Sequence, residues 1–333
     1  MKIHAYTSFT FCYLNRARVL AKTLRQQHPD WVIWAVIVDC PPAGFEFDLS
    51  KEDFDRVITV EMLLGELTNP WLFGHDIVEA CTAVKAHALQ HIMAQPEVEK
   101  VFYFDPDIAV FNSMGEVVDL LDHYNIVVTP HQVEPELANE NQAIIDNEIC
   151  SLQTGIFNLG FLAVNKSPEA QKFVQWWADR LFSFCHDRTD LGLFVDQKWC
   201  NLIPCFFEGV KVLRNPGYNV ASWNLSKRKM AYDENGQAQI NNQPLRFFHF
   251  TKLGPTGDVM TKRYARDNME IHELWAWYCQ EVANATDPLI PNGWWYYGIY
   301  SDGSAIEKSS RVLYRNKNNL AKHLPQLSNP FNR

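Results

Sequence analysis

The chain has 333 residues, enough for one large α/β domain or two smaller ones. Its net charge of −9 argues against nucleic acid as a partner, although basic side chains can still gather around phosphates. No apolar run approaches the length of a membrane span, and the start lacks the long apolar region of a signal peptide. We therefore expect a cytoplasmic protein, for which any membrane contact is peripheral.

The first predicted elements form a βαβ unit. Residues 3–8 have the pattern of a strand, and 15–27 show the apolar spacing of a helix. Residues 31–38 form a β-rich apolar run that ends at Asp39, where Cys40-Pro41-Pro42 stops it. Further helices are expected at 76–95, 115–123, 168–184, 196–203 and 267–283, and strands at 101–104, 126–129, 155–165, 210–213 and 247–250. The segments 133–150 and 214–244 are expected to consist mainly of loops.

The most informative motif follows the predicted strand 101–104. Asp105 and Asp107 are separated by one proline, and residues two apart on an extended segment point the same way. Two converging carboxylates repel each other unless a cation lies between them. Oxygen ligands suit Mg²⁺ or Mn²⁺, and such ions usually also bind substrate phosphates. The motif therefore predicts a metal site for a phosphorylated ligand in an α/β domain.

A second D-x-D in the chain serves as an internal control. Asp53 and Asp55 lie in a charged segment without a buried strand before them, so we predict a solvated turn or helix start there. The eight cysteines form no C-x-x-C pair, which favours free thiols over disulfides or a zinc site.

The order of the motifs resembles that of a known enzyme family. The βαβ start, the lysine-bearing helix, the D-x-D strand, an Asn-Leu-Gly segment, an Asp-Gln pair and a late His-Phe-Thr-Lys-Leu-Gly resemble GT-A glycosyltransferases. The arrangement is most similar to retaining, family-8-type enzymes that use nucleotide-sugar donors. The resemblance implies an α/β, Rossmann-like nucleotide-diphospho-sugar transferase fold for residues 1–255. Residues 256–333 then form an aromatic-rich helical extension, expected on the acceptor side.

The resemblance also implies a set of site residues. Mn²⁺ (or Mg²⁺) would be held by Asp105, Asp107 and His249, and an imidazole ligand suits Mn²⁺ better. Asp105 would also touch the donor ribose. The other residues implied at the donor are Thr7 and Asp39 for the nucleoside, Lys85, Lys252 and Gly254 for the diphosphate, and Asn158 for the sugar.

The implied catalytic pair is Asp196-Gln197, near the anomeric carbon. Either side chain would steady the positive charge that develops there, or Asp196 would attack the carbon. An inverting enzyme would instead need a carboxylate base beside the acceptor, for which Glu134, Glu136 and Asp196 are candidates. The stereochemistry therefore stays open. Trp223-Asn224 resembles a further pair of the family, without an assigned role.

Most of these residues have a structural alternative. A histidine in an apolar strand, such as His249, is more often a hydrogen-bonded core residue. Lys85 would by default be a solvated helix lysine, and Asp196 a helix cap. Three others are typical of strand ends for local reasons: Thr7, Asp39 and Asn158. The C-terminal tryptophans and tyrosines can stack on sugars, but packing is the more usual role of such side chains.

Taken together, the sequence predicts a metal-dependent hexosyltransferase. The enzyme would move a sugar from a nucleotide-diphosphate sugar, by resemblance a UDP-sugar, to a glycan, lipid or protein acceptor. The alternatives are an inverting enzyme and a non-catalytic nucleotide-sugar or glycan-binding protein of the same fold. A phosphatase with a nucleophilic D-x-D aspartate is disfavoured, because that motif usually follows the first strand of its domain.

Overall fold

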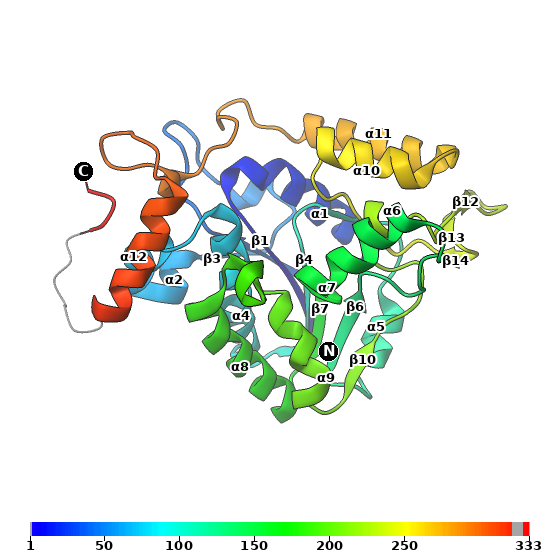
Figure 1. The fold of residues 1–333 in the computed structure, drawn as a ribbon, viewed down its shortest axis with the longest axis horizontal. Helices are drawn as coiled ribbons and strands as arrows, with labels where there is room; N and C mark the ends of the chain where they lie inside the picture. The colour runs from blue at the N-terminus through cyan, green and yellow to red at the C-terminus, as the bar shows by residue number, and fades with distance from the viewer. Residues whose placement is uncertain (1, 322–328, 333) are drawn as a thin grey trace.

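The computed structural model describes residues 2–321 and 329–332, and a seven-stranded mixed sheet forms its centre (Figure 1). The strand order is β10-β6-β7-β4-β1-β2-β3, in which β7 runs antiparallel to both neighbours and the other pairs are parallel. These strands are β1 (Lys2–Phe9), β2 (Val32–Ile37), β3 (Arg56–Thr59), β4 (Val98–Phe104), β6 (Ile126–Pro130), β7 (Phe157–Asn165) and β10 (Val210–Val212). The predicted α/β class and the N-terminal βαβ unit are confirmed.

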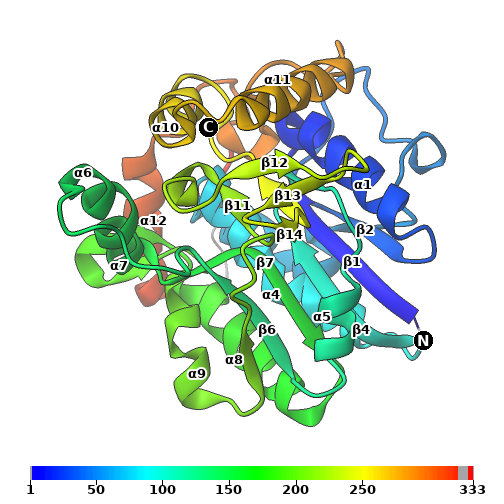
Figure 2. The same ribbon diagram turned by 90° about the vertical axis from the view of Figure 1, so that its right-hand side faces the viewer.

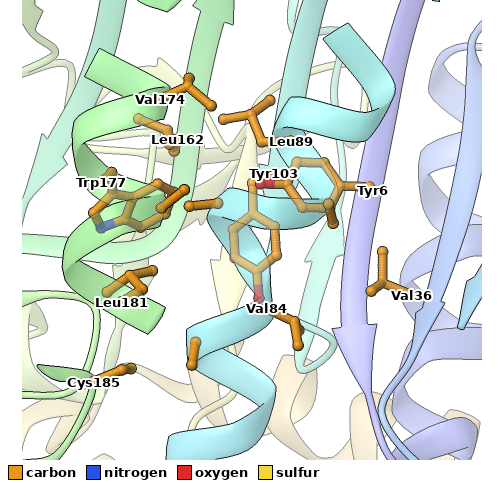
Figure 3. Close-up of a cluster of buried hydrophobic side chains, with 14 of the residues drawn as sticks. Tyr6, Val36, Val84, Leu89, Tyr103, Leu162, Val174, Trp177, Leu181 and Cys185 are labelled. Atoms are coloured by element: carbon orange, nitrogen blue, oxygen red, sulfur yellow. The ribbon is translucent and has the colours of Figure 1, made fainter. Parts of the chain in front are cut away.

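Helices cover both faces of this sheet. On one face, α4 (Ile77–Met93) and α8 (Pro168–Phe184) enclose a core that includes Trp177 and Tyr103 (Figure 3). On the other face, α1 (Leu14–Gln27) and α5 (Gly115–Leu120) pack over a second apolar cluster. Because both faces are covered, the central strands are apolar along nearly their whole length, as parallel sheets require.

The helices before and after the D-x-D strand begin at clear sequence signals. Asp76 accepts a hydrogen bond from the Glu79 N–H, and the Glu79 side chain accepts one from the Asp76 N–H, which forms a capping box for α4. At α8, Ser167 accepts from the N–H of Ala170, and Pro168 occupies the first turn. Both predicted helices are confirmed within a few residues of their expected ends.

A small second sheet lies at the carboxyl end of β4. It has the order β11-β15-β5, with β5 (Ile108–Val110), β11 (Val220–Ala221) and β15 (Phe247–His249).

The remaining elements are α2 (Val60–Leu64), α3 (Thr68–Phe73), α6 (Asn141–Ala143), a π-helical turn (Ile144–Ile149), α7 (Cys150–Thr154), β8 (Asp187–Arg188), β9 (Leu193–Phe194), α9 (Ile203–Phe206), β12 (Met230–Tyr232), β13 (Ala238–Ile240), β14 (Gln243–Pro244), α10 (Pro255–Ala265), α11 (Met269–Asn284) and α12 (Lys308–Ala321), with short 3-10 turns between them.

Several of these elements were not expected from the sequence. The edge strand β3 and the helices α2 and α3 have partly exposed side chains and weak apolar spacing. The helix α10 begins at Gly254-Pro255, which reads as a loop signal although proline is also common in a first helical turn. The segment 214–244, expected to be mainly loop, contains the antiparallel strands β12 to β14, which Figure 2 shows beside β11.

The C-terminal segment returns to the N-terminal βαβ unit. After α10 and α11, which lie along one side of the molecule in Figures 1 and 2, Trp294 Nε1 donates to the Cys40 carbonyl over 2.9 Å. Nearby, the buried Arg311 guanidinium donates to four carbonyls, those of Leu72, Phe73, His75 and Tyr297. Most of the aromatic residues here pack rather than face solvent. One of them, Tyr278, stacks on Phe250 at 3.8 Å.

Two expectations from composition can be compared with the structure. All eight cysteines are free thiols, as predicted: two are buried, three are half-buried and three are exposed. Within residues 2–321 and 329–332, every helix is too short or too polar to cross a membrane.

The Arg311 contacts lead to a prediction about stability. Arg311→Met keeps the apolar stem but leaves four buried carbonyls without their donor, so we expect a loss of about 3 kcal/mol in the free energy of unfolding. Urea unfolding measures this loss, and limited proteolysis should show earlier cleavage near residue 300. The matched control is Arg188→Met, because Arg188 is exposed and bonds Asp190. Equal stability of the two variants would contradict the proposed anchoring.

Candidate functional site

The D-x-D forms a tight turn between the two sheets. The Asp105 N–H donates to the Gly160 carbonyl over 2.8 Å, which ties the end of β4 to β7. The Ile108 N–H then donates to the Asp105 carbonyl over 3.1 Å, so the chain reverses and enters β5. The proline between the two carboxylates fits this turn because its φ is already fixed. The segment is therefore the hinge between the large and the small sheet.

Strand pairing brings His249 to this turn. In the antiparallel pair of β15 and β5, His249 lies opposite Ile108, directly after the D-x-D. Its Nε2 is 2.9 Å from Asp107 Oδ1 and 3.8 Å from Asp105 Oδ2. One ligand atom from each of the three residues lies within 4.8 Å of the others. The three residues predicted to bind a metal are thus brought together.

The charges of this cluster are suited to a cation. Burial alone would lower the pKa of His249, but the Asp107 carboxylate outweighs it and raises that pKa above its ordinary value. Burial conversely favours neutral Asp107, yet the histidine holds the pKa of this carboxyl below its usual range. Two carboxylates and one imidazole fit Mn²⁺ better than Mg²⁺, and one edge of Asp105 is still exposed for a further ligand.

Lys85 is buried between two carboxylates. Its side chain is only 2% exposed, and its Nζ lies 3.0 Å from Asp105 Oδ1 and 3.0 Å from Asp196 Oδ2. It also donates to the Leu159 carbonyl over 3.0 Å. Burial would lower the pKa of this lysine, but the two carboxylates raise it instead. The default of a solvated helix lysine is therefore wrong, and Lys85 neutralises two aspartates.

The implied catalytic pair lies on the other side of Lys85. Asp196 is buried, and this burial raises its pKa to about 6 despite the attraction of Lys85. Gln197 Oε1 accepts from the Leu159 N–H over 3.2 Å, and Gln197 Nε2 donates to the Thr154 carbonyl over 3.2 Å. Asn158 Nδ2 is 3.4 Å from the same Oε1. Hydrogen bonds of Gln197 thus join the pair to the Asn158 segment.

The two residues expected at the nucleoside differ in their surroundings. Thr7 lies inside β1, and its buried hydroxyl has no hydrogen-bond partner in the part of the chain that the structure describes. The Asp39 carboxylate accepts backbone N–H groups from Phe11, Cys40 and Tyr296 at 2.8–3.1 Å. Burial nevertheless raises the pKa of Asp39 to about 7. Asp39 therefore holds the C-terminal segment against the end of β2.

The expected diphosphate loop follows β15 directly. Lys252 has a φ of 53° and Gly254 a φ of 118°, so both adopt conformations that leave the strand sharply before α10 begins. The glycine meets no steric penalty there, which explains its presence. Lys252 is exposed three residues after His249, and its ammonium has no ion pair among the described residues. Its predicted contact with a diphosphate stays a prediction.

Two side chains near the cluster were not predicted, and a third, Trp223, had been named without a role. Tyr103 donates to Asp105 Oδ1 over 2.6 Å, and its position two residues earlier on the same strand face was the available signal. Arg16, in the first turn of α1, lies close enough to contribute to the lowered pKa of Asp107, after the larger effects of burial and His249. The Trp223 ring meets the His249 ring edge-on at 5.3 Å, which gives that family residue a position.

The other residues named for an inverting mechanism have mixed surroundings. Glu136 is buried, and its Oε1 accepts from Asn147 and Ser226 at 2.8 and 2.6 Å. Glu134 is exposed. Asn224, the second residue of the Trp223-Asn224 pair, is buried, and its amide donates to the carbonyls of His131 and Asn219. Glu136 and Asn224 thus have structural partners that account for their burial.

A cleft of about 520 Å³ opens beside this region. Its wall is formed by the ends of β6 and β10, the start of β7 and the helix α7. Gln132 lines it and donates to the Trp223 carbonyl over 2.7 Å, so the cleft is one residue away from the ring that packs on His249. Its lining includes the apolar Leu152 and Ile156 and the polar Glu148 and Arg214.

Comparison with known proteins places the fold. No family model matches the chain. The uncharacterized protein YfnD of Bacillus subtilis (strain 168) is 26% identical over 255 residues, which is 74% of this chain and 77% of YfnD. Among solved structures, the galactosyltransferase LgtC in complex with donor and acceptor sugar analogs matches with a TM-score of 0.51 at 17% identity, covering 88% of this chain and 98% of LgtC. Mouse xyloside xylosyltransferase 1 in its apo form gives a TM-score of 0.42 at 17% identity, over 77% and 99% of the two chains. The chain has the GT-A fold.

The Asp105–Asp107–His249 cluster leads to a prediction that uses both D-x-D motifs. Asp107→Ala removes a carboxylate 2.9 Å from His249, so we expect it to abolish the rise in melting temperature that Mn²⁺ with UDP produces. Asp53→Ala changes an exposed carboxylate outside the cluster and should leave that rise intact. Thermal-shift assays and calorimetric titration measure both effects. Equal loss in the two variants, or no loss in either, would argue against the site.

A second prediction concerns pH. Because Asp107 raises the pKa of His249, the proton starts to compete with a metal ion at a higher pH than it would at an ordinary histidine. The apparent affinity for Mn²⁺ should therefore fall by roughly tenfold per pH unit once the histidine is protonated. Electron paramagnetic resonance of free Mn²⁺ follows this fall. His249→Ala should bind weakly with little pH dependence, whereas the exposed His123→Ala should behave like the wild type.

Proposed function

We propose that this protein is a metal-dependent glycosyltransferase that uses a nucleotide-diphosphate sugar. The observation that carries the proposal is the Asp105–Asp107–His249 cluster at the carboxyl end of β4 in a GT-A fold. Ligands of α/β sheets bind at the carboxyl ends of the strands. By resemblance, the nucleotide is UDP, the ion is Mn²⁺ and the transferred group is a hexose.

The donor would lie across the hinge between the two sheets. The bound ion would neutralise negative charge on the departing diphosphate. Lys252 follows His249 by three residues, and Arg16 lies close enough to Asp107 to lower its pKa. We propose that both cations hold phosphate oxygens. Thr7, whose buried hydroxyl has no described partner, would bind the nucleoside. Asp39 would shape that end of the site through the backbone it holds.

The reacting carbon of the sugar would face Asp196-Gln197. We propose retention of configuration, in which the leaving phosphate takes the acceptor proton and no strong base is needed. The partners of Glu136 support this course, because that carboxylate is already held by two donors. Asn158 and Lys85 would keep Gln197 and Asp196 in place beside the sugar.

The cleft beside Gln132 is the proposed place of the acceptor. Its mixture of apolar and polar lining residues suits a sugar ring, carried by a glycan, a lipid or a protein. A lipid acceptor would bring the protein to a membrane surface. The free thiols support a reducing compartment, and we propose that the enzyme works in the cytoplasm.

The proposal is tested by following release of UDP from a panel of UDP-sugars with and without Mn²⁺. A glycosyltransferase should hydrolyse its donor slowly even without an acceptor, and only with the metal. Binding of UDP that needs Mn²⁺, together with no UDP release from any sugar donor, would instead favour the non-catalytic binding protein. If the protein neither binds UDP nor releases it from any sugar donor, the nucleotide-sugar proposal is wrong.

The same assay examines the catalytic pair. We expect Gln197→Ala to lower the rate of UDP release by about 10²–10³ while donor binding changes little, because a group that acts in the transition state lowers kcat and kcat/KM together. The control is Lys198→Ala, which changes the next residue, whose side chain bonds the Leu152 carbonyl. A lower melting temperature with an unchanged specific rate would show that Gln197 serves the fold and would move the reacting centre elsewhere.

A further inference from the structure

The hydrogen bonds around Gln197 fix the direction of a neighbouring amide. A backbone N–H can only donate and a carbonyl can only accept. Gln197 Oε1 accepts from the Leu159 N–H, and Gln197 Nε2 donates to the Thr154 carbonyl, so the two ends of this side chain are not interchangeable. The atom of Asn158 that faces Gln197 Oε1 at 3.4 Å must therefore be its Nδ2.

A second backbone group gives the same answer for Asn158. The Gly160 N–H points to Asn158 Oδ1 over 3.3 Å, so this atom must be the oxygen. Asn158 Nδ2 also lies 3.3 Å from His131 Nε2, which gives its second proton an acceptor. Both amide protons are thus directed away from the metal cluster, and only the oxygen is left to face His249.

This orientation determines which nitrogen of His249 carries hydrogen. His249 Nδ1 is 3.2 Å from Asn158 Oδ1, an atom that can only accept, so Nδ1 is the donor. The other nitrogen, Nε2, then presents its lone pair in the neutral ring. That lone pair faces Asp107 Oδ1 at 2.9 Å, an arrangement that is favourable only with a cation between the two atoms or a proton on Nε2.

An independent steric observation concerns Gly160. A Cβ at this position would lie 2.5 Å from His249 Cε1, 2.7 Å from His249 Nδ1 and 2.8 Å from Asn158 Oδ1. Such distances are far below van der Waals contact, and the ring is buried on its strand. The φ of Gly160 is not positive, so the residue is required for space and not for backbone conformation. Any larger residue would displace the imidazole from the cluster.

We propose that Asn158 and Gly160 are positioning residues for His249. Asn158 fixes the tautomer that offers Nε2 to a divalent cation, and Gly160 leaves room for the ring to reach it. This inference rests on the proposed metal site and deepens it. It gives the Asn-Leu-Gly segment a role at the metal, in addition to the contact with the donor sugar that the family resemblance implies.

The test compares the Mn²⁺ affinity of variants, measured by electron paramagnetic resonance with and without UDP. Asn158→Leu removes the acceptor of the Nδ1 hydrogen and should weaken Mn²⁺ binding about 10–100-fold, as loss of such supporting hydrogen bonds does. Asn158→Asp keeps an acceptor at the same place, so its Mn²⁺ affinity should stay within about threefold of the wild type. Gly160→Ala should also bind Mn²⁺ more weakly, because its methyl group displaces the His249 ring.

The matched control is Asn165→Leu, at the other end of β7. Asn165 Nδ2 donates to the carbonyls of Leu121 and Tyr124, so this variant should be less stable but bind Mn²⁺ like the wild type. Wild-type affinity in Asn158→Leu, or equal weakening in Asn158→Asp, would overturn the tautomer role. If circular dichroism shows that Asn158→Leu does not fold, the Mn²⁺ affinities of Gly160→Ala and Asn158→Asp test the proposal instead. No Mn²⁺ binding by the wild type would overturn the metal site itself, and the positioning role with it.

Discussion

The structure depends on one buried ammonium group. Lys85, on α4, lies between Asp105 at the end of β4 and Asp196 after β9, and it also holds a carbonyl of β7. Without it, the buried Asp196 carboxylate would face the half-buried Asp105 carboxylate with no compensating charge, and loss of one partner of a buried ion pair typically costs about 3–5 kcal/mol. The ion pairs therefore join one helix, two strands and the segment of the proposed reacting centre into a single rigid unit. Asp105, Asp107 and His249, the proposed metal ligands, lie at the edge of that unit.

Asp105 links this unit to the cluster because its two oxygens have separate tasks. Oδ1 is held by Lys85 at 3.0 Å and by the Tyr103 hydroxyl at 2.6 Å, whereas Oδ2 faces His249 at 3.8 Å. One oxygen is thus fixed by the protein, and the other is presented outward in a defined direction. Ligands whose rotamers are locked in advance lose little entropy when they bind, which is how rigid sites gain affinity.

The sequence was sufficient for the parts of this site that depend on local pattern. The strand before Asp105, the capping box of α4 and the proline between the aspartates are all readable in order along the chain. What it could not supply were contacts across the sheet: that Lys85 would be buried between Asp105 and Asp196, or that Asp39 would accept an N–H from Tyr296. These contacts join residues far apart in the chain, and only the strand order brings them together.

The pairing of β15 with β5 has a consequence for how the protein folds. His249 reaches Asp107 through a strand pair whose members are separated by most of the α/β domain. Closing so long a loop has an entropic cost that is offset only when the large sheet between them already exists, so such contacts form late. The three ligand atoms therefore meet only once the chain has nearly finished folding. A ligand of such a site would bind only the completely folded protein. It would bind neither the unfolded chain nor an early folding intermediate.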